Sequence, residues 1–227
     1  MVTLFTQHGL TQFAKRLATG FVLGVGFWTL FAYLPPIYFS LVLGIILTLI
    51  IVYEWKNFFD VTNLSFWLIM PFYPILPFAF LISMNQNPAH HALLFVLFII
   101  VFSFDTGSYL VGSTLGYHKI APSISPRKSW EGVAGGWIFA CIGLILVLWE
   151  LGKSKSPLFI MVFTLFVCIL SLIGDLFESF LKRRAGIKDS GTLLPGHGGF
   201  LDRFDGILFT VIFFYIFKDY LVKLFEL

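Results

Sequence analysis

The sequence predicts an all-α, polytopic integral membrane protein with about seven transmembrane helices and a polar site at the cytoplasmic face. Three observations lead to this fold class: 58% of the 227 residues are hydrophobic, only 12% are charged, and the mean hydropathy is +0.91. Soluble domains are about 45–50% apolar and about 25% charged, so a soluble, disordered or disulfide-stapled protein is excluded. The net charge of +3 is too small to indicate a nucleic-acid partner.

Apolar runs give the candidate spans, each near the ~20 residues that cross a bilayer. The first run is interpreted as a retained span rather than a cleaved signal, because it is long and lacks a small-residue cleavage site. Three prolines, Pro71, Pro74 and Pro77, predict a kink or a break in the third run, since proline removes a backbone donor. The runs cover residues 17–34, 37–53, 64–83, 92–111, 133–149, 157–175 and 206–223.

The basic residues favour one orientation in the membrane. With seven spans and a cytoplasmic N-terminus, most Lys and Arg side chains fall on the cytoplasmic side, as the positive-inside rule expects. This orientation puts the two most polar segments, 105–131 and 175–205, on one face, where cytosolic nucleotides could reach a shared site. We divide the chain into N-terminal transmembrane helices, 1–91, and a C-terminal catalytic region, 92–227.

The segment 175–205 begins with a polar stripe on a predicted helix. Asp175, Glu178, Ser179, Lys182 and Arg183 follow the spacing i, i+3, i+4, i+7 and i+8, which places them on one helix face. A charge at mid-span costs about 2.5–3.5 kcal/mol on insertion scales, so such residues persist when they are paired, solvated or functional. The alternative is a solvated helix end with local ion pairs.

A glycine-rich loop follows the stripe. Lys188 and Asp189 precede the sequence Pro-Gly-His-Gly-Gly at 195–199. Glycines let backbone N–H groups approach phosphate oxygens closely, so Gly196, Gly198 and Gly199 are candidate phosphate-binding positions. His197 is a candidate phosphate donor or loop-fixing residue, with a general base as a further option. An ordinary tight turn is the alternative.

Two carboxylates close the segment. Asp202 and Asp205 are spaced i, i+3, so they share a helix face and can bind one hard cation, with Asp175 as a third ligand. Mg²⁺ prefers oxygen ligands and keeps waters and substrate phosphates in its shell. The alternative is that both acids favour the start of a helix through its dipole.

The other polar segment supplies further cations. Arg127 and Lys128 could clamp a pyrophosphate or a lipid phosphate, or form an ordinary positive-inside loop. Asp105, inside the fourth apolar run, could pair with one of them. The remaining polar residues in apolar surroundings are interpreted as interface residues, namely Glu54, Asp60, His90 and His91. Cys141 and Cys168 are interpreted as small buried hydrophobes.

The segment from Ser179 to Asp205 carries the gap-free pattern S-x-L-K-R-x4-K-D-x-G-x2-L-P-G-H-G-G-F-x-D-R-F-D. It resembles the signature of the phosphatidate cytidylyltransferases, also called CDP-diacylglycerol synthases. Residues 105–109 and 124–132 also resemble family segments, as do Arg16 and Glu54-Trp55. Arg127 stands where Lys is frequent, and the chain is shorter than many members, by about one helix in its first half.

The resemblance implies a Mg²⁺-dependent enzyme that joins CTP and phosphatidate to give CDP-diacylglycerol and pyrophosphate. It implies a metal centre at Asp175, Asp202 and Asp205, with a monovalent cation such as K⁺ as a possible second ion. It also implies a homodimer in a bacterial-type inner membrane, multi-pass, with the active site facing the cytoplasm. Nucleotidyl transfer to a phosphomonoester needs no strong general base, because the second pKa of such an ester is about 6.

Each candidate residue has an expected role. The catalytic group comprises Asp175, Lys182, Arg183, Asp202 and Asp205. The substrate-binding group comprises Asp105, Ser125, Arg127, Lys128, Ser179, Lys188, Asp189, Gly196, His197, Gly198, Gly199 and Arg203. Two other functions compete: a CTP-dependent lipid or polyprenol kinase (or a synthase acting on an ether lipid), and an ion-coupled transporter. The transporter requires symmetry between halves, which the sequence lacks.

Overall fold

The structure is a computed structural model that describes residues 20, 22, 24–194, 196 and 198–227. Lys15, Arg16 and most of the start of the first apolar run lie outside these residues. The described part of that run is helical over residues 24–32. Only this portion of the first predicted span can therefore be compared with the sequence prediction.

Within the described residues, five helical stretches are long and apolar enough to cross a membrane. They are Pro36–Phe58, Leu64–Asn85, Pro88–Leu115, Trp130–Glu150 and Pro157–Arg184. Five predicted spans are thus confirmed as helices of this kind. The last predicted span consists of two shorter helices, α9 (Leu201–Ile216) and α10 (Lys218–Phe225). The total of about seven stays a prediction.

The prolines break the third predicted span, as expected. It consists of α4 (Leu64–Ile69), a π-helical turn η2 (Pro71–Ile75) and α5 (Leu76–Asn85). Tyr73 leaves the helical region, with φ −152° and ψ 108°, and its peptide bond to Pro74 is cis. The break turns the Tyr73 side chain into the interior, where it is buried.

A second π-helical turn lies in the preceding span. Helix α2 (Pro36–Leu49) continues through η1 (Ile50–Glu54) into the short α3 (Trp55–Phe58). The side chains of Glu54 and Trp55 at this junction are buried. Such π-turns occur often at functional sites, and this one places an acid inside the protein.

The other long helices have local start signals. Helix α6 (Pro88–Leu115) begins after Asn87, whose side chain accepts from two backbone N–H groups. Helix α7 (Trp130–Glu150) begins after Ser129, and α8 (Pro157–Arg184) after Ser156, both with side-chain caps. These are preferred N-cap residue types, because their side-chain oxygens satisfy the unpaired donors of the first turn.

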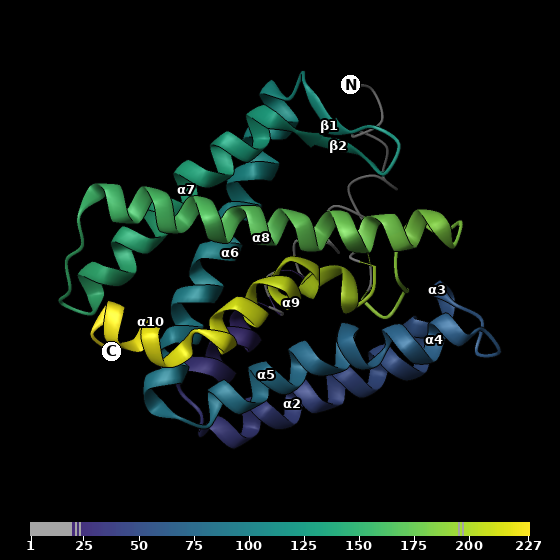
Figure 1. Cartoon of the computed structure of the whole chain (residues 1–227), viewed down its shortest axis with the longest axis horizontal. Helices are drawn as coiled ribbons and strands as arrows, with labels where there is room; N and C mark the ends of the chain where they lie inside the picture. Colours follow the sequence, from purple (N-terminus) through teal and green to yellow (C-terminus); the bar gives the residue numbers. More distant parts are fainter. Residues whose placement is uncertain (1–19, 21, 23, 195, 197) are drawn as a thin grey trace.

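The all-α prediction needs one addition, a small β-hairpin between α6 and α7. Strand β1 (Lys119–Ala121) pairs antiparallel with β2 (Ser125–Ser129), with Lys119 opposite Ser129 and Ala121 opposite Ser125. Strand β2 contains Arg127 and Lys128 and leads directly into α7. Figure 1 shows the hairpin projecting from the α6–α7 pair.

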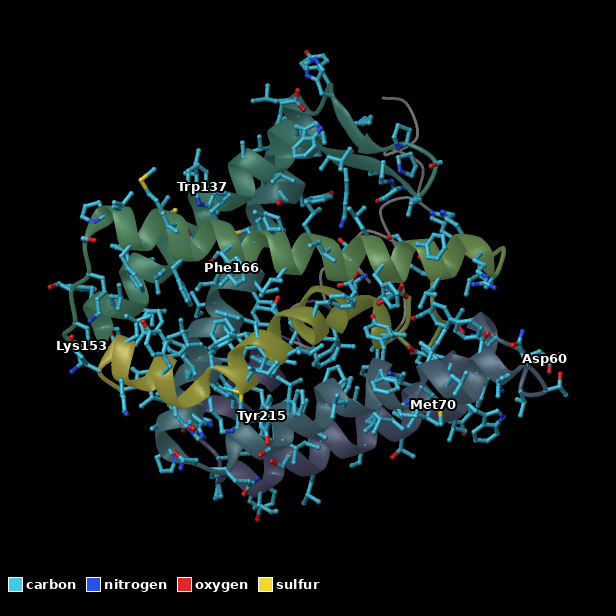
Figure 2. The ribbon with its side chains drawn as sticks, in the orientation of Figure 1. Asp60, Met70, Trp137, Lys153, Phe166 and Tyr215 are labelled. Carbon is cyan, nitrogen blue, oxygen red and sulfur yellow. The ribbon has the colours of Figure 1, made fainter. Side chains whose placement is uncertain are left out.

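The helices form packed pairs that surround the polar region. Helices α6 and α7 pack along each other most extensively, α8 packs on α9, and α2 packs on α5. Figure 1 shows α2 and α5 as a layer below α9, with α8 crossing above. In Figure 2, Asp60 in the α3–α4 loop and Lys153 in the α7–α8 loop lie at opposite ends of the long axis.

The buried core is largely aromatic and aliphatic, and it accounts for much of the Phe content. Phe27, Phe31, Phe39 and Phe98 form one cluster of stacked and edge-to-face rings. Cys168 is buried and Cys141 is partly buried, and both are free thiols. The interpretation as a small buried hydrophobe is confirmed for Cys168, whereas the partly buried Cys141 thiol lies 3.1 Å from the Thr164 hydroxyl.

Candidate active site

The two polar segments meet around one cavity of about 740 Å³. Its walls come from α6, the β2 strand, the start of α7, the end of α8 and the start of α9. The shared location of the two segments, inferred from the topology, is therefore confirmed. The predicted residues that line the cavity are Asp105, Arg127, Lys128, Asp175, Lys182, Asp189, Asp202, Arg203 and Asp205.

A close crossing of α8 and α9 places two of the acids. A Cβ atom on Gly174 would lie 2.5 Å from the Asp205 carbonyl oxygen, and Gly206 faces Ser171 at similarly short range. Glycines at both positions let the helix backbones approach. Asp175 and Asp205 are each next to one of these glycines, so the crossing brings both carboxylates to the cavity.

Lys182 is the buried cation of the site. Its Nζ lies 3.1 Å from Glu178 Oε1 and 2.6 Å from Asp202 Oδ1. Its side chain is 10% exposed, and that of Glu178 is fully buried. The hydroxyl of Tyr73 donates to Glu178 Oε2 at 3.2 Å. The proline break thus supplies a donor to this network, and one ammonium group serves two carboxylates.

Asp202 connects Lys182 to the glycine-rich loop. Its Oδ2 accepts from the backbone N–H of Ser190 at 2.9 Å, the Ser190 hydroxyl at 2.9 Å and the Gly199 N–H at 2.8 Å. Burial alone would raise the pKa of the Asp202 carboxyl. The Lys182 ammonium and the backbone donors outweigh burial, so the pKa lies below its ordinary value.

The carboxylates at the cavity differ in their partners. Lys128 forms an ion pair with Asp175 Oδ2, which joins the hairpin to α8. Asp205 accepts from the N–H of Gly206 at 2.8 Å. The charges of Asp105, Asp175 and Asp205 interact repulsively. A cavity with three mutually repelling carboxylates is suited to bind a cation.

The oxygen donors fit Mg²⁺ in kind. Among the described residues, no three His, Cys, Asp or Glu side chains are arranged to hold a metal ion. Protein sites for Mg²⁺ commonly use one or two carboxylates together with waters and substrate phosphates. Asp175 and Asp205 can supply such a partial set. Both oxygens of Asp202 are engaged by Lys182, Ser190 and Gly199, so its predicted role as a metal ligand stays a prediction.

The glycine-rich loop is held by contacts with Asp202. Gly196 and Gly198 have φ of 77° and 84°, a region that disfavours other residues. A Cβ on Gly198 would lie 2.6 Å from Asp202 Oδ2. The Gly199 N–H donates to Asp202 in this structure. Phosphate binding by the Gly199 N–H therefore stays a prediction. Pro195 and His197 lie outside the described residues.

Seven of the predicted site residues that the structure describes do not line the cavity: Ser125, Ser179, Arg183, Lys188, Gly196, Gly198 and Gly199. The Arg183 guanidinium donates to the carbonyl oxygens of Ile124 and Ile187, both at 3.1 Å. It therefore braces the hairpin and the 185–188 turn against α8. Ser179 Oγ lies 3.4 Å from Asp175 Oδ1. Lys188 is exposed.

The interpretation of Glu54 as an interface residue is wrong. Its side chain is buried, and its carboxylate accepts from Ser190, Phe200 and Leu201. Asn57, one turn later, donates to the Ser190 carbonyl oxygen at 2.8 Å. The sequence signal that could have identified Glu54 was its position as an acid at the end of an apolar run. The energetic argument applied to Asp175 holds equally for Glu54.

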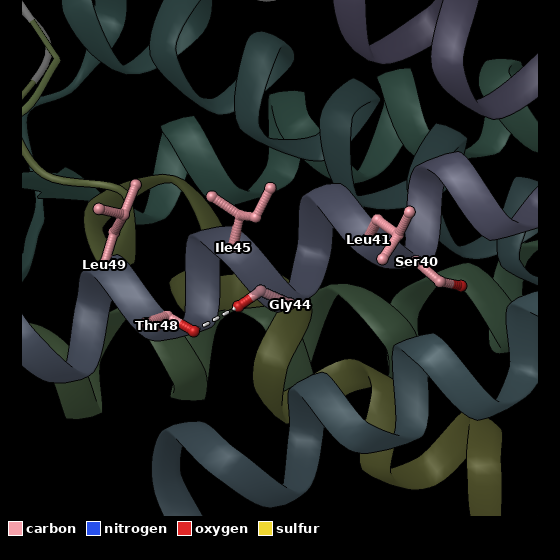
Figure 3. Close-up of a pocket in the computed structure, with 6 residues that line it drawn as sticks. All are labelled: Ser40, Leu41, Gly44, Ile45, Thr48 and Leu49. Atoms are coloured by element: carbon pink, nitrogen blue, oxygen red, sulfur yellow. Dashed lines mark hydrogen bonds between the residues drawn. The ribbon is translucent and has the colours of Figure 1, made fainter.

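A second hollow, of about 360 Å³, lies on the outer side of α2 (Figure 3). It is lined by residues of that helix from Ser40 to Leu49, and the Thr48 hydroxyl there donates to the Gly44 carbonyl at 2.9 Å. The lining contains no charged side chain. Its chemistry is that of an apolar surface, so the charged cavity is the candidate active site.

Apolar helices of spanning length and a cavity lined by both carboxylates and cations are typical of a multi-pass membrane protein with a charged internal site. Comparison with known proteins specifies the class. The model of the Cytidylyltransferase family matches residues 4–221, and the chain belongs to this family. The family resemblance of the 179–205 signature is confirmed.

Relatives carry a common name. The phosphatidate cytidylyltransferase of Bacillus subtilis (strain 168) is 37% identical over 163 residues, 70% of this chain and 60% of that protein. That of Rickettsia bellii (strain RML369-C) is 34% identical over 211 residues, 88% of each chain. That of Staphylococcus haemolyticus (strain JCSC1435) is 37% identical over 156 residues, which cover 69% of this chain and 59% of that protein. The chain thus spans about 60% of the length of two of these relatives and 88% of the third.

Proposed function

We propose that this protein is a phosphatidate cytidylyltransferase, which transfers CMP from CTP to phosphatidate and releases pyrophosphate. The observation that carries the proposal is the single cavity in which the 175–205 signature meets the cations of the β2 strand. Family membership and the names of the relatives support the same activity.

The reaction joins two polyanions. A phosphate oxygen of phosphatidate attacks the α-phosphorus of CTP, the new P–O bond forms, and the bond to pyrophosphate breaks. The attacking phosphomonoester is already largely dianionic near neutral pH, since its second pKa is about 6. The main obstacle is charge repulsion, which fixed cations lower while they hold the reactants in line.

The chain's own cations can meet this requirement. Arg127, Lys128, Lys182 and Arg203 line the cavity and would neutralise the phosphates. Lys182 is held in place by its two carboxylate partners, so its ammonium group is already oriented before a substrate binds. Asp189 lies at the same cavity and would orient the nucleotide or a nearby lysine.

Asp175 and Asp205 would hold Mg²⁺, with Asp202 as a further candidate and K⁺ as a candidate second ion. The ion would supply charge neutralisation at the transferring phosphoryl group. Asp105 adds an oxygen donor on the facing helix. Lys128 pairs with Asp175 in this structure, so its ammonium group is held at the cavity, where it would neutralise a substrate phosphate.

The membrane setting completes the proposal. The protein would lie in a bacterial inner membrane with the cavity open to the cytoplasm, because the positive-inside distribution of Lys and Arg favours this orientation. CTP would then reach the site from the cytosol, and phosphatidate would reach it from the bilayer. A homodimer is proposed from the family resemblance.

Transfer of label tests the activity. Purified protein is incubated in mixed micelles with phosphatidate, Mg²⁺ and CTP labelled at either the α or the γ phosphorus. We expect the α label in the lipid product and the γ label in pyrophosphate. Label transferred only from the γ position would establish a lipid kinase instead. No transfer to phosphatidate from a folded protein would overturn the proposed cytidylyltransferase activity.

A further inference from the structure

Glu54 contacts the active-site segment from the opposite half of the chain. Its carboxylate accepts from the Phe200 N–H at 2.7 Å and the Leu201 N–H at 2.9 Å, and its Oε2 lies 3.1 Å from the Ser190 hydroxyl, whose one proton it shares with Asp202. The side chain is 1% exposed and does not line the cavity. The contacts join residues that are 136 to 147 positions apart in the sequence.

Two of these donors form the N-terminus of α9. Phe200 is the N-cap position and Leu201 is the first helical residue, and the Phe200 side chain provides no cap. The first backbone N–H groups of a helix have no partner within the helix. Glu54 supplies this partner from another helix, and its negative charge suits the positive end of the α9 dipole.

The glycines of the loop leave room for this carboxylate. A Cβ on Gly199 would lie 2.6 Å from Glu54 Cδ, and a Cβ on Gly191 would lie 3.0 Å from Glu54 Cγ. Larger residues at these positions would displace Glu54 or the loop. Two signature glycines are therefore explained by contact with the second span, independently of any bound phosphate.

Ser190 transmits the contact to the charged network. Its hydroxyl lies within hydrogen-bond distance of both Glu54 Oε2 and Asp202 Oδ2, and its N–H also donates to Asp202. Asp202 in turn holds Lys182 at 2.6 Å. A continuous set of contacts thus leads from Glu54 to the buried cation of the active site.

We propose that Glu54 is a positioning residue of the active site. By capping α9 from the second span, it sets the position of Asp202, Arg203 and Asp205 relative to α8. It acts through these residues and does not contact substrate. The proposal rests on the proposed cytidylyltransferase function for its kinetic consequences, whereas its structural consequence for α9 can be measured without activity.

The kinetic test compares Glu54→Gln with Glu150→Gln, the same substitution at the exposed end of α7. A glutamine amide presents N–H groups where Glu54 accepts, so at least one bond to the loop is lost. We expect kcat per folded molecule to fall at least 20-fold, with KM for CTP changed less than threefold, because the β2 cations remain. Glu150→Gln should keep the wild-type kcat. A role in folding alone would reduce the folded yield and leave kcat per folded molecule unchanged.

Ser190→Ala provides a second variant and a coupling test. It removes one of the three donors to Glu54, and we expect a smaller, about fivefold loss of kcat. Because the two side chains share a hydrogen bond, the double variant should lose much less than the product of the single losses. Independent, multiplicative losses would contradict the proposed connection. If Glu54→Gln does not fold, hydrogen exchange of the Phe200 and Leu201 amides is measured in Ser190→Ala, and unchanged exchange there would contradict the proposed connection.

Hydrogen exchange of the segment 189–203 is the readout that does not need activity. We expect the Phe200 and Leu201 amides to exchange at least tenfold faster in Glu54→Gln, with no change in α6. If the wild type makes no CDP-lipid, the proposed function fails, and this exchange measurement alone decides the Glu54 proposal. Unchanged exchange overturns it, and so does a wild-type kcat in an active Glu54→Gln enzyme.

Discussion

A single buried ammonium group, that of Lys182, neutralises two carboxylates at the centre of the site. Glu178 and Asp202 lie 3.1 and 2.6 Å from it, and all three side chains are at most 10% exposed. Removal of one partner from a buried ion pair costs about 3–5 kcal/mol, because the remaining charge is left uncompensated. We therefore expect Lys182 to contribute to stability as well as to the proposed catalysis, so one substitution cannot separate the two roles.

A charge-balanced pair of variants separates them. We expect Lys182→Met to lose thermal stability in detergent and to lower kcat/KM at least 100-fold. Lys182→Met combined with Glu178→Gln removes one charge of each sign, so it should regain stability but not activity. Thermal unfolding and lipid product formation are measured on the same preparations. Recovery of activity in the double variant would assign Lys182 a purely structural role.

The depressed pKa of Asp202 predicts a specific pH dependence of stability. A carboxyl group with a folded-state pKa below its unfolded value of about 3.9 stabilises the protein above that value. This stabilisation is lost as the pH falls through the folded-state pKa. We expect the difference in unfolding free energy between wild type and Asp202→Asn to be constant above about pH 5 and to shrink below about pH 4. A difference that stays constant down to pH 3 would contradict the assigned contacts.

Sequence reasoning identified most of the site at this scale. The helical spacing correctly placed Asp175 and Lys182 on one polar face, and the topology correctly joined them to Lys128. It missed Glu54, because the contact depends on a π-turn and on a partner 146 residues away. It placed Arg183 in the catalytic group, whereas this side chain donates to the hairpin and does not line the cavity, so its catalytic role stays a prediction. Such through-space contacts leave no local periodicity in the sequence.

At the scale of elements, close helix packing at glycines positions the two halves of the cavity. Gly135, Gly136 and Gly143 of α7 all face α6 at distances that leave no room for a side chain. Small residues permit such approach between membrane helices. The α6–α7 pair thereby fixes the hairpin that contains Arg127 and Lys128, and the α8–α9 crossing fixes the acids.

Gly136→Ala tests the importance of the α6–α7 contact. A Cβ there would lie 2.6 Å from the Phe104 carbonyl oxygen, so α7 has to move. We expect a loss of about 1–3 kcal/mol in stability, as for other overpacked cores, together with reduced activity. Gly44→Ala is the matched control, because no atom lies within 4 Å of its added Cβ. Equal behaviour of the two variants would contradict the packing argument.

Elements with strong local signals were predicted, and others were not. The proline-rich run correctly predicted the break at Tyr73, because proline acts locally. The β1–β2 hairpin was missed, since residues 119–129 are polar and short and lack an alternating pattern. The interruption at Phe217 between α9 and α10 comes directly before Lys218 and Asp219, a local polar signal that the predicted single span over 206–223 did not take into account.

Across the whole molecule, the proposed function requires that the loops at the two ends of the long axis lie on opposite sides of the membrane. Asp60 and Lys153 lie in loops at opposite ends of the long axis (Figure 2). The predicted topology puts the first loop in the cytoplasm and the second outside. This assignment determines whether CTP can reach the cavity from the cytosol.

Cysteine labelling tests the orientation. Cys141 and Cys168 are first replaced by alanine, and a single cysteine is then introduced as Asp60→Cys or Lys153→Cys. In intact cells, an impermeant maleimide should label Lys153→Cys only. After permeabilisation it should also label Asp60→Cys. The reverse pattern would place the loop at Asp60 outside and contradict the cytoplasmic site.

The decisive experiment compares wild type, Asp205→Asn and Asp60→Asn for transfer of the α label of CTP to phosphatidate. Asp205 lines the cavity. Asp60 has the same side chain but lies in a loop, where its carboxylate accepts hydrogen bonds from Thr62. We predict CDP-diacylglycerol from wild type and Asp60→Asn at equal rates, and a loss of at least 100-fold in folded Asp205→Asn. A wild-type rate in Asp205→Asn would contradict the assignment of this cavity as the active site.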